Sequence, residues 1–261
     1  MKDSVEISSI NKDTLDEICT IISYPNGCIN RCRSIIYAFR KIGIKKLVFT
    51  GRVKIGKYSV LGKGCESIVL LGVNEDGRKV AIKLRREDSR RPSLKTEAER
   101  LKLVNKLGIG PKLLYATDDF LIMEYIKGES LEKAVLEKED RVILRIIIDL
   151  LEQCWKMDRL GIIHLELSRP HEHVLIRETD GQPVIIDFET TSISTRKTNL
   201  TQVASFLFFR NSMLSRKVKN LFGIDNKKAV KLRRLLRLYK KNRGDPLLYR
   251  KIVDLILTGL K

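Results

Sequence analysis

The spacing of apolar residues changes several times along the chain. Residues 12–23 and 29–42 carry apolar side chains three and four positions apart, which predicts two amphipathic helices joined around Pro25. Residues 45–57 instead show short apolar runs broken by glycine, as strands do. Two helices and a ribbon fit a small helix-turn-helix-like module or a helical extension that packs on the next domain, and we favour the extension.

From Tyr58 the pattern predicts a strand-rich segment. The runs YSVLGKG, SIVLLGV and KVAIKLRR are strand-like, and residues 93–107 form a predicted helix with Ser93 as its N-cap. Two further strands, KLLYATDD and FLIMEYIKG, end at Gly128. This segment therefore predicts an antiparallel sheet with one helix.

Beyond Gly128 the pattern is mainly helical. Asn199 and Gln202 are spaced like a capping box at the start of one predicted helix. The predicted helices are 129–136, 140–160, 199–209 and 226–242, with a short strand in PVIIDFE. The order of elements predicts an α+β fold in three parts, 1–57, 58–127 and 128–261.

Composition indicates a soluble globular protein, because 43% of the 261 residues are hydrophobic and 32% are charged. Residues 1–11 are polar, so no secretory signal is expected, and the longest apolar run contains Arg145 and Asp149. We therefore expect no membrane partner and a cytoplasmic location. The five scattered cysteines include no CxxC pair, which predicts neither a disulfide framework nor a zinc knuckle.

The charge of +19 is unevenly distributed. Residues 196–261 hold 18 Lys and Arg against 3 Asp and Glu, whereas residues 113–195 hold 9 against 17. Such segregation favours a polyanionic partner, and nucleic acid fits best. The alternative is a basic face that only contacts solvent.

Candidate chemistry begins in the strand-rich segment with GKGCESIV. Gly62, Gly64, Ser67 and Val69 have the spacing of a GxGxxGxV loop, with serine in place of the last glycine. Glycine lets backbone N–H groups approach and donate to phosphates. An ordinary hairpin would look the same.

Further signals follow this loop in order. VAIK places Lys83 at the end of a strand, where an ammonium can hold nucleotide phosphates. Glu97 on the next helix is the expected partner of Lys83, and Glu99 points elsewhere because residues two apart do not share a helix face. The strand FLIMEYIKG places Met123 at the back of a pocket, with the backbone of two residues available to a purine edge. These two residues are Glu124 and Ile126.

The chain's three histidines all lie in HLELSRPHEHV, residues 164–174. Glu166 in this loop and Asp187 after the apolar strand PVII form an acid–strand–acid arrangement. Phosphoryl transfer needs one carboxylate at the attacking hydroxyl and one on a metal that binds the phosphates. A transition-metal site built from His171, His173 and a carboxylate is the rival interpretation.

Taken together and in this order, these motifs resemble the Gly-rich loop, VAIK, HRD and DFG of the protein-kinase-like superfamily. GKGCESIVLL, the hinge MEYI and the absence of APE are similar to atypical Rio-type kinases and to the small kinase subunit of the tRNA threonylcarbamoylation complex. HxELSRPxxHV with DFE resembles an archaeal group of serine/threonine-kinase-like proteins that includes a tRNA 2′-hydroxyl kinase. The resemblance covers residues 58–210. It implies a bilobal protein-kinase-like fold, with a β-rich N-lobe and a helical C-lobe, that binds ATP and Mg²⁺.

The resemblance also implies roles by position. Lys83 would hold the nucleotide phosphates with Glu97 as its anchor, and Glu166 would stand at the catalytic aspartate. The other implied site residues are His164 at the catalytic-loop histidine, His173 (or His171) at the loop asparagine, Asp187 at the metal-binding aspartate, and Gly62, Gly64, Ser67, Val69, Ala81, Met123, Glu124 and Ile126 around the nucleotide.

Besides Ser67, three positions depart from the kinase pattern. Glutamate for aspartate at Glu166 still supplies an anionic acceptor, because the two acids have similar pKa values. Histidine for asparagine disfavours a second Mg²⁺, since Mg²⁺ prefers oxygen ligands, so a single ion on Asp187 is expected. Glu189 replaces the flexible glycine of DFG, which argues against a flip of that motif.

The acceptor remains open between an RNA and a protein hydroxyl. The basic C-terminal segment favours RNA, most of all tRNA, since a peptide kinase needs no such field. A serine/threonine protein kinase and a non-catalytic RNA-binding pseudokinase are the alternatives.

Overall fold

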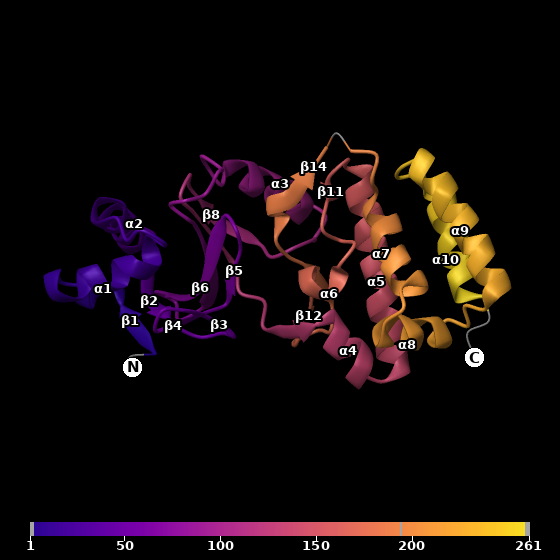
Figure 1. Ribbon diagram of the computed structural model, residues 1–261, viewed down its shortest axis with the longest axis horizontal. Coiled ribbons are helices and arrows are strands. Elements are labelled where there is room, and N and C mark those ends of the chain that lie inside the picture. Colours follow the sequence, from indigo (N-terminus) through magenta and orange to yellow (C-terminus); the bar gives the residue numbers. More distant parts are fainter. Residues whose placement is uncertain (1–2, 194, 259–261) are drawn as a thin grey trace. The chain divides into compact units, whose positions relative to one another are not determined.

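The computed structural model describes residues 3–193 and 195–258, and the chain is mixed α+β. It divides into two compact units. Unit 1 comprises the chain up to Lys102 together with Pro111–Tyr125, and unit 2 comprises Leu103–Gly110 and the chain from Ile126 onward. Figure 1 labels the elements of both units. Within the described residues, no helix combines the length and the apolar composition needed to cross a membrane.

Unit 1 is built on an antiparallel sheet with one short hairpin beside it. Its elements are β1 (Ser4–Glu6), the 3-10 turn η1 (Ile7–Ser9), α1 (Lys12–Ile22), α2 (Ile29–Lys41), β2 (Ile44–Val48), β3 (Val53–Ile55), β4 (Tyr58–Val60), β5 (Gly62–Lys63), β6 (Ser67–Asn74), β7 (Lys79–Arg85), α3 (Lys95–Asn105), β8 (Leu113–Ala116) and β9 (Phe120–Glu124). The strand order is β1-β2-β6-β7-β9-β8, with β5 also paired to β6 and with β3 paired only to β4. The last turn of α3 belongs to unit 2.

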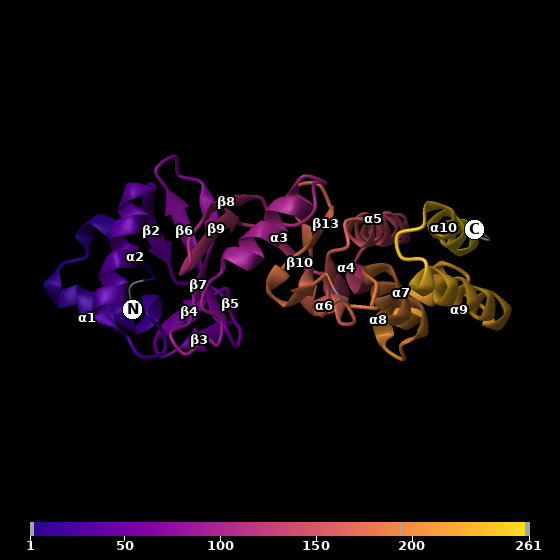
Figure 2. The same cartoon turned by 90° about the horizontal axis from the view of Figure 1, so that it is seen from above.

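The first 57 residues share the hydrophobic core of this sheet. Ile18 of α1 and Phe39 of α2 belong to the same buried cluster as Leu47 of β2 and Leu70 of β6. The rings of Phe39 and Phe120 meet edge to face at 5.0 Å, a favourable aromatic geometry. Both helices lie on the β2 side of the sheet in two perpendicular views (Figure 1, Figure 2). They are therefore a layer of unit 1 and not a separate module.

One expectation about the cysteines is wrong. Cys19 of α1 and Cys32 of α2 form a disulfide, with their Cα atoms 5.4 Å apart and both side chains fully buried. Helical spacing places each cysteine on the apolar face of its own helix, and the packing of the two helices brings these faces together. The disulfide depends on the tertiary packing of the two helices, so no local CxxC pattern predicts it.

Unit 2 is mainly helical and carries two small sheets within its described residues. Its elements are β10 (Gly128–Ser130), α4 (Leu131–Glu137), α5 (Asp140–Arg159), β11 (Ile163–His164), α6 (Pro170–His173), β12 (Val174–Arg177), β13 (Pro183–Ile185), the 3-10 turn η2 (Phe188–Thr190), β14 (Thr191–Ser192), α7 (Asn199–Phe209), α8 (Met213–Leu221), α9 (Asn226–Lys241) and α10 (Pro246–Leu257). The sheets are β10-β12-β13 and β11-β14. A side chain at Gly128 would collide with the backbone of Ile176 at 2.2 Å, so glycine is required where β10 meets β12.

The core of unit 2 contains a charged group, Asp158, at the end of α5. Its carboxylate accepts hydrogen bonds from the backbone N–H groups of Asn199 (2.7 Å) and Leu200 (3.1 Å), and from the hydroxyl of Tyr239 (3.0 Å). Burial raises the pKa of Asp158 to about 6, and these donors act against that rise. The carboxylate thereby fastens the N-terminus of α7 and the C-terminal turn of α9 to α5.

The predicted capping box at the start of α7 is wrong. Thr198 is the N-cap, and its side chain accepts a hydrogen bond from the N–H of Thr201. Asn199 is buried, and its amide donates to Asp158 and to the carbonyl of Ile162. Gln202 donates to the carbonyl of His164. Both amides therefore bind tertiary partners, which local spacing does not reveal.

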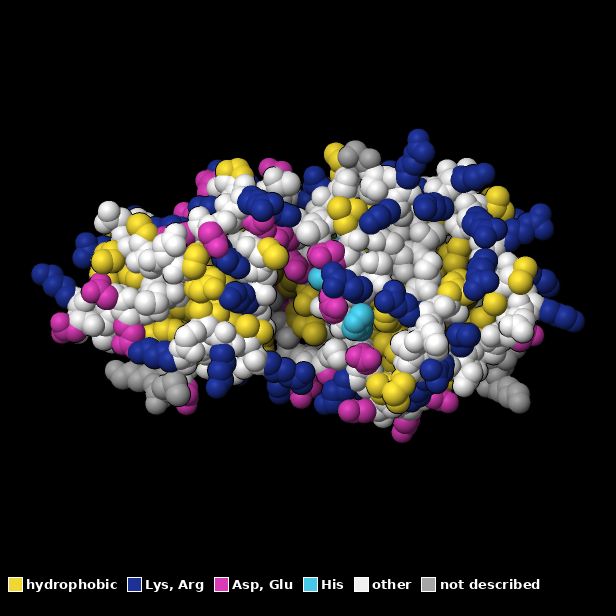
Figure 3. Space-filling view, in the orientation of Figure 1, with side chains coloured by type: hydrophobic (Ala, Val, Ile, Leu, Met, Phe, Trp, Pro, Cys, Tyr) yellow, Lys and Arg dark blue, Asp and Glu magenta, His cyan; other side chains and the backbone are white. Residues whose placement is uncertain are grey.

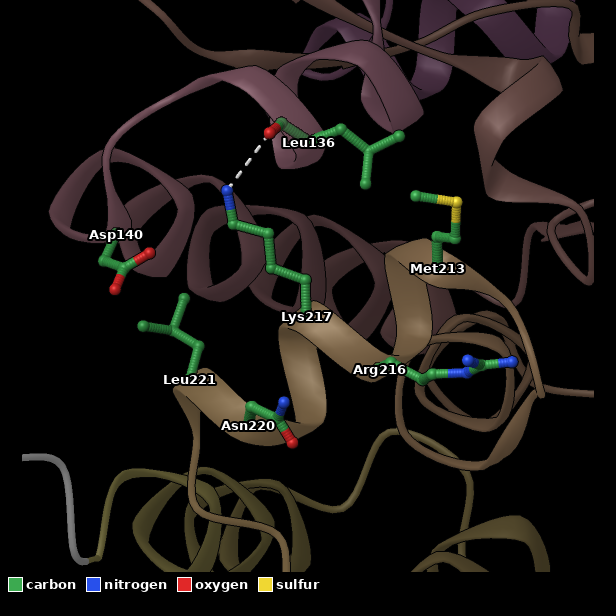
Figure 4. Close-up of a pocket in the computed structure, with 7 residues that line it drawn as sticks. All are labelled: Leu136, Asp140, Met213, Arg216, Lys217, Asn220 and Leu221. Atoms are coloured by element: carbon green, nitrogen blue, oxygen red, sulfur yellow. Dashed lines mark hydrogen bonds between the residues drawn. The ribbon is translucent and has the colours of Figure 1, made fainter.

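A hollow beside α8 is lined by a residue that makes a capping interaction. Lys217 of α8 reaches the carbonyl of Leu136 at the end of α4, as Figure 4 shows, and also that of Lys138, each at 3.3 Å. A cation there complements the negative end of the α4 dipole. This contact holds α8 against α4 and gives Lys217 a structural role.

Candidate functional site

In unit 1 the structure brings together Lys83 and Glu97. Lys83 lies near the end of β7 and Glu97 in the first turn of α3, with Nζ 2.8 Å from Oε1. Both residues are buried, whereas Glu99 is exposed. The partner of Lys83 is therefore Glu97, as the helix periodicity predicted. A buried charge without a partner is costly, so each residue holds the other in place.

The glycine-rich stretch forms the tight hairpin between β5 and β6. Gly62 pairs with Val69, and the N–H of Gly64 donates to the carbonyl of Ser67 at 2.8 Å. The Gly64 N–H is therefore engaged in the hairpin, contrary to the expectation that the loop amides are free to donate. Ser67 is buried at the start of β6.

The hairpin is fastened to the basic segment that follows β7. Arg86 donates to the carbonyl of Gly64 at 2.9 Å. The carboxylate of Glu66 accepts from the hydroxyl of Ser89 at 2.5 Å and from the N–H of Arg90 at 2.8 Å. The Ser89 hydroxyl is the main reason that the pKa of Glu66 is lowered. These contacts hold the loop at Gly64 and at Glu66.

The remaining predicted nucleotide residues lie where two strands meet. Ala81 of β7 pairs with Met123 of β9, next to the pair of Val80 and Glu124. The N–H of Glu124 donates to the carbonyl of Lys112 at 2.8 Å. That N–H is therefore engaged within unit 1, and a purine edge would have to use other groups. Ile126 is buried and begins unit 2.

In unit 2 the structure brings together Glu166, His173 and Asp187. One possible ligand atom from each lies within 4.8 Å of the other two. Glu166 follows β11, His173 ends α6, and Asp187 follows β13. Histidine side chains lie beside acidic ones on the face drawn in Figure 3. Two carboxylates and an imidazole at this distance can hold a divalent cation or hydrogen-bond a ligand.

The buried His164 supports the loop that carries Glu166. One ring nitrogen, Nε2, lies 3.1 Å from the carbonyl of Ile186, and the other, Nδ1, accepts from the N–H of Glu166 at 3.3 Å. A carbonyl needs a donor and an N–H needs an acceptor, so the ring is neutral with its proton on Nε2. Burial lowers the pKa of His164, and the neighbouring His173 lowers it further, in agreement with this form.

Glu166 is held by two donors that sequence reasoning missed. Its Oε2 accepts from the hydroxyl of Thr190 at 2.6 Å, and its Oε1 faces the guanidinium of Arg169 at 3.4 Å. Arg169 also pairs with Glu172 at 2.9 Å. Thr190 directly follows DFE, but only the pairing of β11 with β14 places it beside the loop. The carboxylate therefore has a fixed direction.

The two remaining histidines have different surroundings. His173 is only 7% exposed, and in the part of the chain that the structure describes neither of its ring nitrogens has a hydrogen-bond partner. Its Nε2 lies 3.9 Å from Oε2 of Glu166. His171 instead stacks on Phe206 with ring centroids 5.0 Å apart. His173 is therefore the histidine of the acidic cluster, and among the described residues His171 belongs to no group of possible metal ligands.

Asp187 occupies a left-handed backbone conformation, with φ of 64°. A residue other than glycine there costs on the order of 1 kcal/mol, which surrounding contacts must offset. Phe188 is buried and packs edge-on against His164 at 5.7 Å. Burial of Phe188 turns the exposed Asp187 toward the other two cluster residues.

The cluster offers oxygen and nitrogen ligands to the expected Mg²⁺. Carboxylate oxygens of Asp187 and Glu166 suit Mg²⁺, and the buried, unbonded nitrogen of His173 suits a metal ion or a ligand donor. The residues thus fit one divalent cation, with the imidazole as the donor that Mg²⁺ favours least.

Comparison with known proteins gives one relative and no family description. No family model matches the chain. A protein of Methanocaldococcus jannaschii, named as the uncharacterized protein MJ1211, is 33% identical over 120 residues, which is 46% of this chain and 99% of that protein. The match covers nearly the whole of the archaeal protein, and the chain therefore belongs to the same family as MJ1211.

Proposed function

We propose that the chain is an ATP- and Mg²⁺-dependent kinase of the atypical, Rio-like type, with a bilobal protein-kinase-like fold. The observation that carries the proposal is the cluster of Glu166, His173 and Asp187 in unit 2. The buried pair of Lys83 and Glu97 in unit 1 supports it, because a fixed ammonium can bind nucleotide phosphates. Both sets occur in the order that the motifs predicted.

In this proposal each residue acts at a stated atom. Lys83 would bind the phosphates of ATP, and Asp187 with His173 would hold the cation, which would neutralise phosphate charge. Glu166 accepts a hydrogen bond from the acceptor hydroxyl, and Thr190 with Arg169 keeps the carboxylate directed. The hydroxyl oxygen bonds to the γ-phosphorus while the bond from that phosphorus to the β,γ-bridging oxygen breaks. ADP leaves with that electron pair, and the hydroxyl proton passes through Glu166 to solvent.

The acceptor that fits best is a ribose 2′-hydroxyl of a structured RNA, with tRNA as the leading candidate. Residues 196–261 carry 18 basic against 3 acidic side chains, and RNA is bound largely through its phosphates. A protein hydroxyl is the second candidate, and it rests on the motif resemblance alone.

A labelling experiment tests both acceptors. The protein is incubated with γ-labelled ATP, Mg²⁺ and either total tRNA or a generic acceptor protein. We expect label in tRNA, reduced about 10²–10⁴-fold by Glu166→Gln, as for loss of a catalytic carboxylate. Asp187→Ala should abolish it. Glu172→Gln is the matched control, because Glu172 also pairs with Arg169 but lies outside the cluster.

Each of the other outcomes would change the proposed function in a defined way. Label only in protein would replace the RNA acceptor by a protein acceptor. ATP binding without transfer to either acceptor would show a non-catalytic pseudokinase. Equal loss in Glu166→Gln and Glu172→Gln would contradict the role of Glu166.

A further inference from the structure

A strongly basic groove lies in unit 2 along the C-terminal half of α9. It is a hollow of about 780 Å³ between residues 195–197 and α9 with the turn that follows it, and seven of its nine lining residues are arginine or lysine. The other two are Thr195 and Leu238, so no lining residue is acidic. We call this hollow the α9 groove. Basic side chains also gather over the C-terminal helices on the face drawn in Figure 3.

The cationic side chains of the α9 groove come from segments that packing and hydrogen bonds hold in place. Arg234, Arg237 and Lys241 are exposed and follow at spacings of three and four, so they share one face of α9. On the opposite side of that helix, Tyr239 is buried and donates to Asp158. Arg243 donates to the carbonyl of Thr195 at 3.1 Å and so fixes the segment that bears Arg196. The two walls are therefore joined.

Within the described part of the chain, no ion pair neutralises the charge of the α9 groove, although Arg243 acts electrostatically on the buried Asp158 carboxylate. Among the described residues, none of its seven cations forms an ion pair with a carboxylate, whereas lysines elsewhere in unit 2 do, as Lys133 and Lys138 do with Glu129. Like charges held together repel, and a polyanion that enters relieves this repulsion and releases counterions. The groove is thus complementary to a row of phosphates.

Its dimensions suit a nucleic-acid strand. Residues 234–241 of α9 extend over about 10 Å at the helical rise of 1.5 Å per residue. Duplex DNA carries one phosphate per strand for about 3.4 Å of helix axis, so a length of this order can contact a short row of phosphates. The second wall begins eight residues after Asp187 in the sequence.

A membrane surface fits the α9 groove less well. A helix that lies on a bilayer needs a free apolar face to insert beneath its basic face. The apolar side of α9, with Leu232, Leu236 and Tyr239, is buried in unit 2. Figure 2 shows α10 lying alongside α9, and the two helices are in contact.

We propose that the α9 groove binds the phosphate backbone of the RNA acceptor, an inference that rests on the proposed function for the identity of that RNA.

Two matched double variants test this inference in the full chain. Arg237→Gln/Lys241→Gln removes two charges from the groove, and Lys227→Gln/Lys231→Gln removes two exposed charges at the same spacing on the same helix outside it. Glutamine keeps a similar helix propensity, so both variants should fold, which circular dichroism would check. Binding of a fluorescent, tRNA-sized folded RNA is measured by anisotropy without ATP at several salt concentrations.

We expect the groove variant to bind RNA more weakly. Its slope of log affinity against log salt should be less steep by about two, which is about one for each phosphate contact. The control variant should keep the wild-type slope. Equal effects of the two variants, or none from the groove variant, would overturn the inference. Arg196→Gln/Lys197→Gln tests the other wall and should behave like the groove variant.

The outcomes separate this inference from the proposed function. Because binding is measured without ATP, RNA that binds in the groove but is not phosphorylated would refute only the kinase. RNA that is phosphorylated equally by the groove variant would refute only the groove. Wild-type binding to phosphatidylserine vesicles but not to RNA would overturn the groove proposal in favour of a membrane surface.

Discussion

The buried carboxylate of Asp158 makes unit 2 less stable as the pH rises through the acidic range. Replacing it by asparagine removes a titrating group and keeps the shape of the side chain. The carboxylate is 2% exposed and accepts hydrogen bonds from two residues of α7 and from Tyr239. Burial outweighs these donors and raises its pKa from 3.8 to about 6.

The sign and the magnitude follow from proton linkage. The folded chain binds this proton more tightly than the unfolded chain, so the contribution is full below pH 3.8 and is lost as pH rises through 6. Between pH 5 and pH 7.5 the two pKa values give a loss of about 1.4 kcal/mol in the free energy of unfolding. The asparagine variant lacks this term, and other titrating groups cancel in the difference.

The assay is urea unfolding followed by the fluorescence of Trp155, the one tryptophan of the chain. It lies on α5 and donates to the carbonyl of Gly244, so it reports on unit 2. We expect the free energy of unfolding of the wild type, minus that of Asp158→Asn, to fall by about 1.4 kcal/mol from pH 5 to pH 7.5. A difference that is constant or rises with pH would refute the assignment of a raised pKa to this buried carboxyl.

Three further predictions concern the two units. Lys83→Met should weaken ATP binding in calorimetry and destabilise the chain by about 3–5 kcal/mol, because it removes the ammonium that pairs with the buried Glu97 carboxylate; Lys83→Met/Glu97→Leu should recover stability but not ATP binding. Thr190→Val should lower kcat while leaving the KM for ATP unchanged, since Thr190 directs Glu166 and does not bind the nucleotide; an increased KM would contradict that role. Thiol titration in guanidinium without reductant should find three of the five cysteines, and five thiols would exclude the disulfide between α1 and α2.

Local sequence determined most of the secondary structure. The predicted helices at 12–23, 29–42 and 226–242 end within one residue of α1, α2 and α9, since apolar spacing and polar breaks are properties of neighbouring residues. The helix at 199–209 matches α7, although its capping assignment was wrong. The helices α8 and α10 were not assigned, although each begins after a Ser or Asp N-cap that was present in the sequence.

Only some of the contacts in the candidate site could be predicted from the sequence. Helix periodicity selected Glu97 over Glu99, because two positions on one helix cannot share a face. The choice between His171 and His173 needed the short helix α6, which points one ring at Phe206 and the other at Glu166. The role of Thr190 could not be predicted from the sequence, because its contact with Glu166 depends on a strand pairing between distant segments.

Residue order and periodicity therefore determined the elements, the basic charge of the last 66 residues and the candidate chemical groups. Tertiary structure alone decided which groups meet. It joined Cys19 to Cys32, directed the amide of Asn199 to Asp158, and closed residues 195–197 against α9 to form the groove. The physical reason is that periodicity records which side of an element is apolar, whereas the partner of each polar group is set by packing between elements far apart in the chain.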